Sequence, residues 1–265
     1  NTTASNNTSV GSYSLQANTT GTANVAMGYQ SGKNTTTGTC NIAIGNDSRR
    51  DGTTGDNNVA IGFQSLRESE GADNNTAVGH ETLKANTTGN LNQAFGAFSL
   101  QANTEGVRNT AIGSYAMYDN TTGDYNTAVG QSALYNNETA DSNTAVGYVA
   151  LNANTTGGGN TAVGANAGDA VTTGSNNTAL GFESAGKLTT GGDNVAVGRA
   201  ALLDTTTQSG NVAIGVEALE NNTADENVAV GKQALNDNTS GNGNTSIGSF
   251  SLTKNTTAAN NTAVG

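Results

Sequence analysis

A pentapeptide of the form Asn-x-(Ala/Ser)-apolar-Gly recurs along the whole chain, and this repeat constrains the fold more than any other feature. It occurs sixteen times, ending at glycines from Gly11 to Gly265. Fourteen of the fifteen intervals are 17 residues long, and one, Gly215 to Gly231, is 16. A fixed period of this kind indicates one continuous repeat array over residues 1–265, with no linker marking a second domain.

With the glycine counted as position 0, each column of the repeat has a narrow choice of residues. Position 15 is alanine except at Ser9 and Ser246, position 16 is always apolar, and position 4 is mostly leucine. Position 3 is Ser, Ala or Thr, and positions 7 to 10 commonly have the sequence Asn-Thr-Thr-Gly. Position 13 is asparagine in every copy, and we call this column the asparagine ladder: Asn7, Asn24, Asn41, Asn58, Asn75, Asn92, Asn109, Asn126, Asn143, Asn160, Asn177, Asn194, Asn211, Asn227, Asn244 and Asn261.

A 17-residue unit is too short for a helical repeat, because two helices need on the order of 30 residues or more. The 36 Gly, 40 Asn and 41 Thr residues also oppose helix. Short β-favouring segments alternate with turn residues, so we predict an all-β parallel β-solenoid of about sixteen coils, one per repeat. We expect two strands per coil, at positions 13 to 16 and 2 to 5, and a bend with positive φ at the glycine.

Parallel stacking places equivalent residues of neighbouring coils about 4.8 Å apart. The invariant asparagines then either form an amide ladder between coils or occupy a left-handed turn position, and the two interpretations are compatible. The strict smallness of position 15 favours alanines that point inward, with positions 14 and 16 outward; the reverse orientation is the alternative. Either orientation leaves a long, weakly polar strip, which predicts lateral association of chains.

The charge and composition exclude several classes of function. Ten Lys+Arg against 21 Asp+Glu give a net charge of −11, which opposes nucleic-acid binding. The single Cys40 and single His80 supply neither a disulfide framework nor a multi-ligand metal site, and no calcium-binding motif occurs. No apolar run approaches 18 residues, so we expect no membrane insertion. We predict no cofactor, no metal and no catalytic residue, and we interpret His80 as a variable surface residue.

Most of the aromatic residues lie at positions 1 or 2, directly after the glycine. We call these eight residues the aromatic edge: Tyr13, Tyr29, Phe63, Phe98, Tyr115, Tyr148, Phe182 and Phe250. One interpretation is packing against the neighbouring turn. The other is a row of contacts to a second chain or to carbohydrate.

The motif Asn58-Val59-Ala60-Ile61-Gly62, followed by Ser65, resembles the head repeats of YadA-like trimeric autotransporter adhesins. It is also similar to repeat regions of bacteriophage tail fibres and other surface fibres. The resemblance covers essentially the whole chain, although this coil is longer than the usual head repeat. It implies a left-handed parallel β-roll, a homotrimer about a common axis, and a role in surface attachment.

We therefore predict a non-catalytic structural and adhesive fibre module, extracellular on a cell surface or virion, and a segment of a longer fibre. The expected partners are further copies of the chain, as a homotrimer or an end-to-end filament, and a surface glycan or protein receptor. An ice-binding solenoid is the alternative, because outward Thr-x-Val or Thr-x-Ile faces recur, as at 110–112 and 127–129. A polysaccharide-acting β-helix enzyme is a weaker one, because it needs clustered carboxylates, which the repeat does not bring together.

Overall fold

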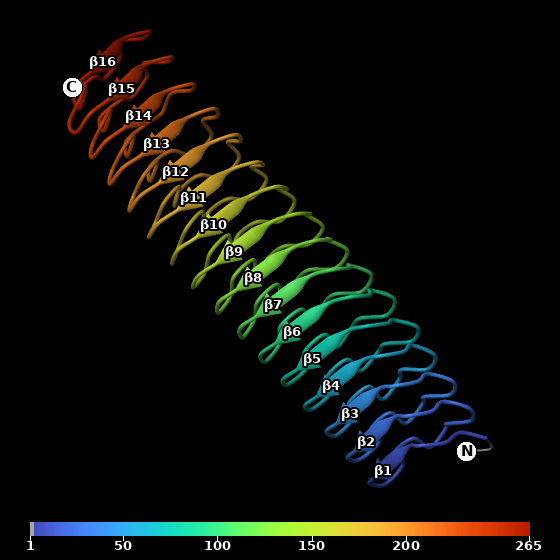
Figure 1. The fold of residues 1–265 in the computed structure, drawn as a ribbon. Helices are drawn as coiled ribbons and strands as arrows, with labels where there is room; N and C mark the ends of the chain where they lie inside the picture. Colours follow the sequence, from blue (N-terminus) through green and yellow to red (C-terminus); the bar gives the residue numbers. More distant parts are fainter. Residues whose placement is uncertain (1–2) are drawn as a thin grey trace. The chain divides into compact units, whose positions relative to one another are not determined.

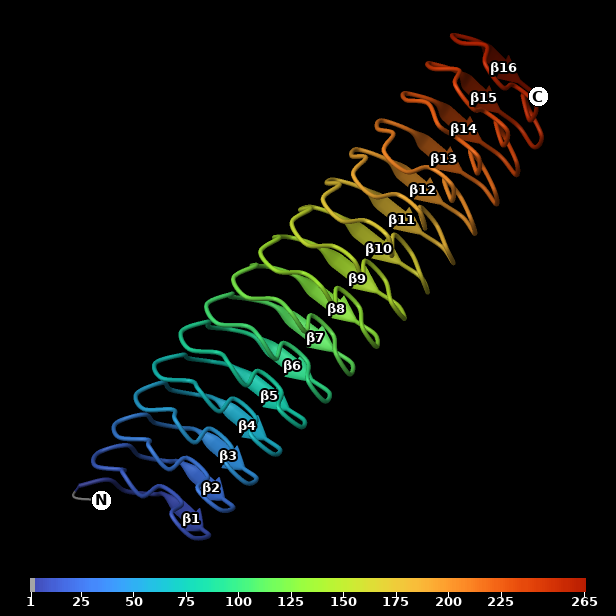
Figure 2. The same ribbon diagram turned by 180° about the vertical axis from the view of Figure 1, so that it is seen from behind.

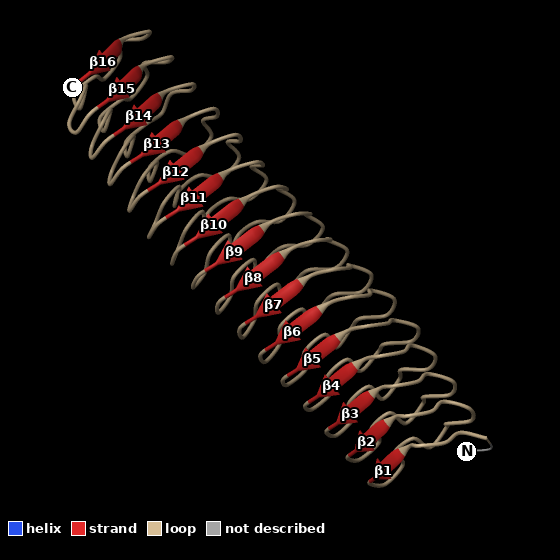
Figure 3. Ribbon diagram, in the orientation of Figure 1, coloured by secondary structure: helices blue, strands red, loops and turns tan. Residues whose placement is uncertain are grey.

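A computed structural model describes residues 3–265, which form two compact units. Among the described residues, unit 1 comprises 3–132 and 137–139, and unit 2 comprises 133–136 and 140–265. Within each unit the chain winds in stacked coils, each contributing one short strand (Figures 1 and 2). Residues 3–265 contain strands, turns and loops and no helix (Figure 3). The predicted all-β parallel β-solenoid is therefore confirmed.

The strands of unit 1 are parallel and pair in chain order, each with the next. The register is strict: Ala43 lies opposite Ala26 and Ala60, one repeat away on either side. The strands are β1 (Thr8–Val10), β2 (Val25–Met27), β3 (Ile42–Ile44), β4 (Val59–Ile61), β5 (Thr76–Val78), β6 (Gln93–Phe95), β7 (Thr110–Ile112) and β8 (Thr127–Val129).

Unit 2 repeats this arrangement with eight further parallel strands, again paired in chain order and in register. They are β9 (Thr144–Val146), β10 (Thr161–Val163), β11 (Thr178–Leu180), β12 (Val195–Val197), β13 (Val212–Ile214), β14 (Val228–Val230), β15 (Thr245–Ile247) and β16 (Thr262–Val264).

The second strand expected at positions 2 to 5 is wrong: this segment is a series of turns. Positions 2 and 4 have positive φ, as at Gln64 (51°) and Leu66 (47°), which is incompatible with extended backbone. The segment is nevertheless bonded to the adjacent coils. Leu66 N–H donates to the Thr82 carbonyl at 2.9 Å, and Glu81 N–H donates to the Phe63 carbonyl at 2.8 Å. Stacking thus satisfies the backbone of this segment without a strand.

The glycine at position 0 meets two requirements that no other residue meets. Gly28 has φ of 134°, as predicted for a bend after the strand, and a Cβ there would lie 2.5 Å from the Gly45 carbonyl oxygen. The stacked glycines therefore allow both the bend and the close approach of consecutive coils.

The interior of each coil is thin and filled by small side chains. The alanines at position 15, such as Ala60 and Ala196, are buried except for the half-buried Ala263 in the last coil, so the inward orientation favoured from the sequence is confirmed. Leucines at position 4, such as Leu66 and Leu219, fill the rest of the interior together with the small residues at position 3, such as Ser65.

The asparagine ladder is buried except at its two terminal members, Asn7 and Asn261, which are half-buried. Asn92 shows the recurring contacts: its Oδ1 accepts from the Asn109 backbone N–H at 2.9 Å, and its Nδ2 donates to the Gly106 carbonyl at 2.8 Å. Direct bonds between the amides, as from Asn41 Nδ2 to Asn24 Oδ1 at 3.1 Å, occur at only some coils. The positive φ of the turn falls one residue earlier, at Cys40 for example, so the left-handed interpretation of this column is wrong.

A second buried asparagine column lies at position 7, where the sequence analysis assigned only turn residues. Asn103 Nδ2 donates to Asn86 Oδ1 at 2.7 Å, and Asn120 Nδ2 donates to Asn103 Oδ1 at 2.8 Å. Most of these amides also donate to the carbonyl three residues later, as from Asn103 to Gly106 at 3.1 Å. The recurrence of asparagine at position 7 was the sequence signal from which this second column could have been predicted.

Arg49 replaces the position-4 leucine in one coil and is fully buried. Its Nη2 donates to the Gly55 carbonyl at 2.7 Å, which is the acceptor that a position-7 asparagine would use, and its Nη1 donates to Thr35 Oγ1 at 3.0 Å. Gly52 at position 7 leaves room for the guanidinium, since a Cβ there would lie 2.8 Å from Arg49 Cζ. Burial lowers the pKa of Arg49 to about 10, despite the opposing charges of Asp56 and Asp73. Arg49 thus fills two interior positions at the cost of burying a charge.

The 16-residue coil keeps the ladder in register. Asn227 N–H donates to Asn211 Oδ1 at 3.0 Å, as in the longer coils. The missing residue is absorbed by the position 7 to 10 turn, where Asn222 Nδ2 donates to the Ala224 carbonyl two residues later instead of three. The strand and the segment from position 0 to 5 are unchanged.

Replacing one ladder residue tests the contribution of these contacts. Asn92→Ala leaves the Asn109 N–H buried without its acceptor. The Gly106 carbonyl keeps only the weaker bond from Asn103 Nδ2. We therefore expect a loss of about 1 to 3 kcal/mol in the free energy of unfolding. The exposed Asn46 is the control, and Asn46→Ala should change the stability by less than about 0.5 kcal/mol. Urea unfolding followed by circular dichroism measures both. Equal effects of the two substitutions would show that the ladder is not a stabilising feature.

Replacing Arg49 and Gly52 by the residues that other coils have at positions 4 and 7 tests the energetic cost of the buried charge. The double substitution Arg49→Leu/Gly52→Asn returns leucine to position 4 and an amide to position 7. We expect it to exceed the wild type in stability by about 1 to 3 kcal/mol, because a buried ion is exchanged for apolar packing with the Gly55 carbonyl still bonded. Arg49→Leu alone leaves the Gly55 carbonyl with the Asn41 amide as its donor and leaves position 7 without a side chain, so it should be less stable than the double variant. A double variant less stable than the wild type would contradict this account.

Candidate functional site

Because the asparagine ladder is buried, its residues stabilise the coil and are not available to a ligand. Three surfaces remain as candidates: the aromatic edge, the outward face of the strands, and one pocket in unit 2. Among residues 3–265 no group of three or more His, Cys, Asp or Glu side chains is placed to hold a metal ion. The same residues include no helix that is long and apolar enough to cross a bilayer.

In unit 1 the aromatic edge is largely a stack of rings. Phe63 stacks on His80 with ring centroids 5.1 Å apart, His80 lies 5.0 Å from Phe98, and Phe98 stacks on Tyr115 at 5.1 Å. Tyr118, at position 5, continues the row at 5.8 Å from Tyr115. Two of these pairs are stacked face to face, whereas His80–Phe98 and Tyr115–Tyr118 are tilted by 59° and 51°. These rings thus pack mainly against one another. His80 is exposed, as expected, but it is also a member of this stack.

The other members of the aromatic edge are less enclosed. Tyr13 and Tyr29 meet edge to face at 6.0 Å, and the Lys232 ammonium lies 5.5 Å from the Phe250 ring centroid. In unit 2, Tyr148 and Phe182 are 56% and 48% exposed and lie two repeats apart. These two rings are available to contact another molecule, as are the similarly exposed Phe250 (56%) and Tyr13 (51%).

The outward face of the strands is flat and uncharged. We call the residues at positions 14 and 16 of each unit the outer face. Position 14 is mostly half-buried, whereas position 16 is exposed at many coils, for example Ile61 (37%), Ile112 (43%) and Leu180 (46%). Because the strands are in register, like side chains form two parallel columns in each unit, made of Val, Ile, Thr and a few other uncharged residues.

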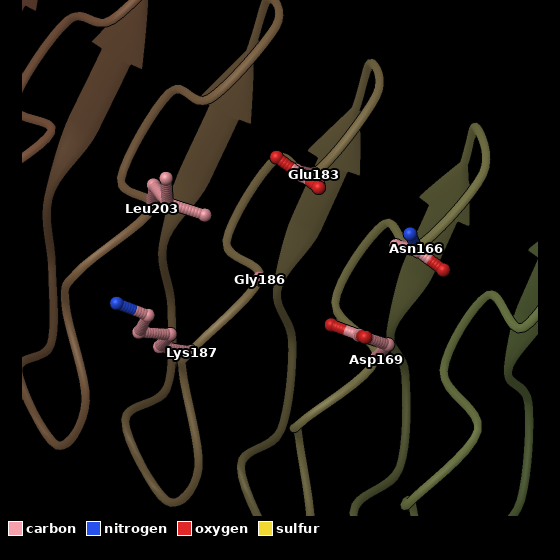
Figure 4. Close-up of a pocket in the computed structure, with 6 residues that line it drawn as sticks. All are labelled: Asn166, Asp169, Glu183, Gly186, Lys187 and Leu203. Carbon is pink, nitrogen blue, oxygen red and sulfur yellow. The ribbon is translucent and has the colours of Figure 1, made fainter.

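A pocket of about 250 Å³ lies in unit 2, beside the turn segments of neighbouring coils. Asn166 and Glu183 occupy position 2 of their coils, and Asp169 and Leu203 occupy position 5 (Figure 4). Gly186 and Lys187 complete the lining. The side chains of Asp169 and Glu183 thus share one pocket, although the sequence analysis predicted no grouping of carboxylates.

Two features set the electrostatics of this pocket. Burial raises the pKa of the Asp169 carboxyl above its ordinary value, and the negative charge of Glu183 raises it further, against opposing hydrogen bonds from the Asp169 and Ala170 backbone N–H groups. On the opposite side, the Lys187 ammonium lies 2.6 Å from Asp204 Oδ1, so its charge is compensated by that carboxylate. The pocket therefore carries a net negative charge.

The chain matches no protein-family model and no curated protein sequence. The candidate surfaces are therefore interpreted from their own chemistry.

Removing the charge of Glu183 tests the proximity of the two carboxyls. In Glu183→Gln the pKa of Asp169 should fall but stay above its ordinary value, because burial still disfavours the ionised form. A raised folded-state pKa means that stability is lost as the pH rises through it, so the variant should show this loss at a lower pH. Carboxyl carbon shifts followed by NMR titration measure the pKa. An unchanged value for Asp169 would show that the two groups do not interact.

Proposed function

We propose that the chain is a non-catalytic structural and adhesive module of an extracellular fibre. The observation that carries the proposal is the outer face, an uncharged and partly exposed surface that follows every coil of each unit. Position 16 contributes an apolar side chain at every coil, and a row of exposed apolar side chains commonly marks an interface. The partner that fits best is a second copy of the same chain, because an in-register column is complementary to another column with the same spacing.

The resemblance to YadA-like adhesin heads and to tail-fibre repeats supports the same proposal. It suggests a homotrimer, in which each chain directs its outer face toward the others. The aromatic edge and the acidic turns then remain at the surface, where Tyr148 and Phe182 are available to a receptor. The net charge of −11 makes nucleic acid an unfavourable partner.

An ice-binding role is the second candidate, supported by one feature of the outer face. Thr144, Thr161 and Thr178 occupy position 14 of consecutive strands and lie directly opposite one another in the register. Such a row offers regularly spaced hydroxyl and methyl groups. Elsewhere the column changes to Val, Ile or Gln, and threonine occupies nine of the sixteen positions. Thermal hysteresis in dilute solution would favour this candidate over the fibre module, and ordinary freezing would exclude it.

Charged substitutions on the outer face test the fibre proposal. We expect the wild type to self-associate, as a trimer if the resemblance holds, and Ile61→Lys/Ile112→Lys to dissociate at least tenfold more readily, because association would bury two ammonium groups. Thr37→Lys, at an exposed turn position, is the control and should associate like the wild type. Sedimentation equilibrium gives the masses, and circular dichroism checks the fold. A wild-type monomer at high concentration would refute association through this face.

A further inference from the structure

The pocket in unit 2 exists because one coil lacks a side chain where the others have one. Position 5 carries a long side chain in most coils, such as Arg67, Gln101 and Tyr118, whereas one coil has Gly186. A Cβ at Gly186 would lie 3.0 Å from Leu203 Cδ1 and 3.7 Å from Asp169 Oδ1, so any other residue would extend into the pocket. Gly186 has no positive φ, and backbone geometry therefore does not require glycine there. Its effect is to open space between Asp169 and Leu203.

The walls of this space combine three kinds of chemistry (Figure 4). Asp169 and Glu183 supply hydrogen-bond acceptors, while the Asn166 amide and the Lys187 ammonium supply donors. Leu203 contributes an apolar wall. The volume of about 250 Å³ is slightly below the range of pockets for drug-sized ligands, so it admits one small ring rather than an extended molecule.

The charge of the pocket narrows the class of ligand. The Asp169 and Glu183 carboxylates repel an anion, and the Lys187 ammonium already bonds to Asp204 at 2.6 Å. Because Asp204 compensates the Lys187 charge, that ammonium opposes a cationic ligand less strongly than the two carboxylates oppose an anion, and an amino sugar is therefore included in the test below. An uncharged ligand with hydroxyl groups suits both the carboxylates and the donor groups of the pocket. A hydroxyl donates to a carboxylate in a strong charge-assisted bond, and it also accepts from an ammonium or amide.

We propose that this pocket binds one neutral sugar residue of a glycan chain. The hydroxyls of the sugar bond to Asp169, Glu183 and Asn166, while one C–H face lies against Leu203. Phe182 directly precedes Glu183 and is 48% exposed, so its ring is available to a second sugar residue beside the pocket. The inference rests on the adhesive part of the proposed function and is independent of self-association through the outer face.

Saturation-transfer difference NMR on the full chain tests the site, with the methyl glycosides of glucose, galactose and mannose as probes. We expect at least one of them to bind. Gly186→Leu fills the pocket without changing its charge, and it should lower the affinity about tenfold or more. Gln16→Leu places the same side chain at an exposed position 5 in unit 1, and it should bind like the wild type. Glu183→Gln removes a charged acceptor and should weaken binding several-fold.

Four results would overturn the proposal. Three of them are no binding by any of the three glycosides, equal binding by the wild type and Gly186→Leu, and equal binding of galacturonic acid and methyl galactoside. Glucosamine that binds far more tightly than methyl glucoside would also overturn it, since the carboxylates would then recognise an ammonium group. Circular dichroism shows whether Gly186→Leu folds, and Glu183→Gln tests the site if it does not. Sedimentation of the same samples separates failure of this site from failure of the fibre module.

Discussion

Each coil of this protein depends on its neighbours to satisfy its buried polar groups. The Asn92 amide bonds to the backbone of the following coil, and the backbone N–H groups of the turn segment bond to the coils on both sides. Buried amides without such partners would be strongly destabilising. The coils must therefore stack in register, and this requirement accounts for the constancy of asparagine, alanine and glycine at fixed positions.

Much of the fold could be predicted from the sequence because the repeat reports on packing directly. The 17-residue period indicated a solenoid, and the small size of position 15 indicated which side of the strand faces inward. Both are confirmed in the structure by the paired strands and the buried alanines. The second strand was wrong because Leu66 and its equivalents look like strand residues. They adopt positive φ, which is unfavourable for a leucine and tolerated because burial and stacking offset the strain.

The features missed from the sequence are those that depend on a residue's neighbours in adjacent coils. The role of Arg49 follows from the absence of a side chain at Gly52, and the pocket follows from the absence of one at Gly186. Asp169 and Glu183 are 14 residues apart, so only the geometry of the coil shows that they line the same space. The two departures from the regular repeat, Gly52 and Gly186, were therefore as informative as the repeat itself. Their effects on neighbouring coils, however, could be recognised only in the three-dimensional structure.

The short coil defines where this architecture accepts changes in length. Loss of one residue between Asn222 and Ala224 leaves the strand register intact, because the position 7 to 10 turn closes with a tighter hydrogen bond. The same deletion inside a strand would reverse the direction of every following side chain in it and expose the alanine. Insertions and deletions should accordingly accumulate in that turn in any lineage of such chains. Gain or loss of an entire coil would preserve the strand register and the asparagine ladder, so recombination between repeats can alter the number of coils while keeping the contacts that all coils share.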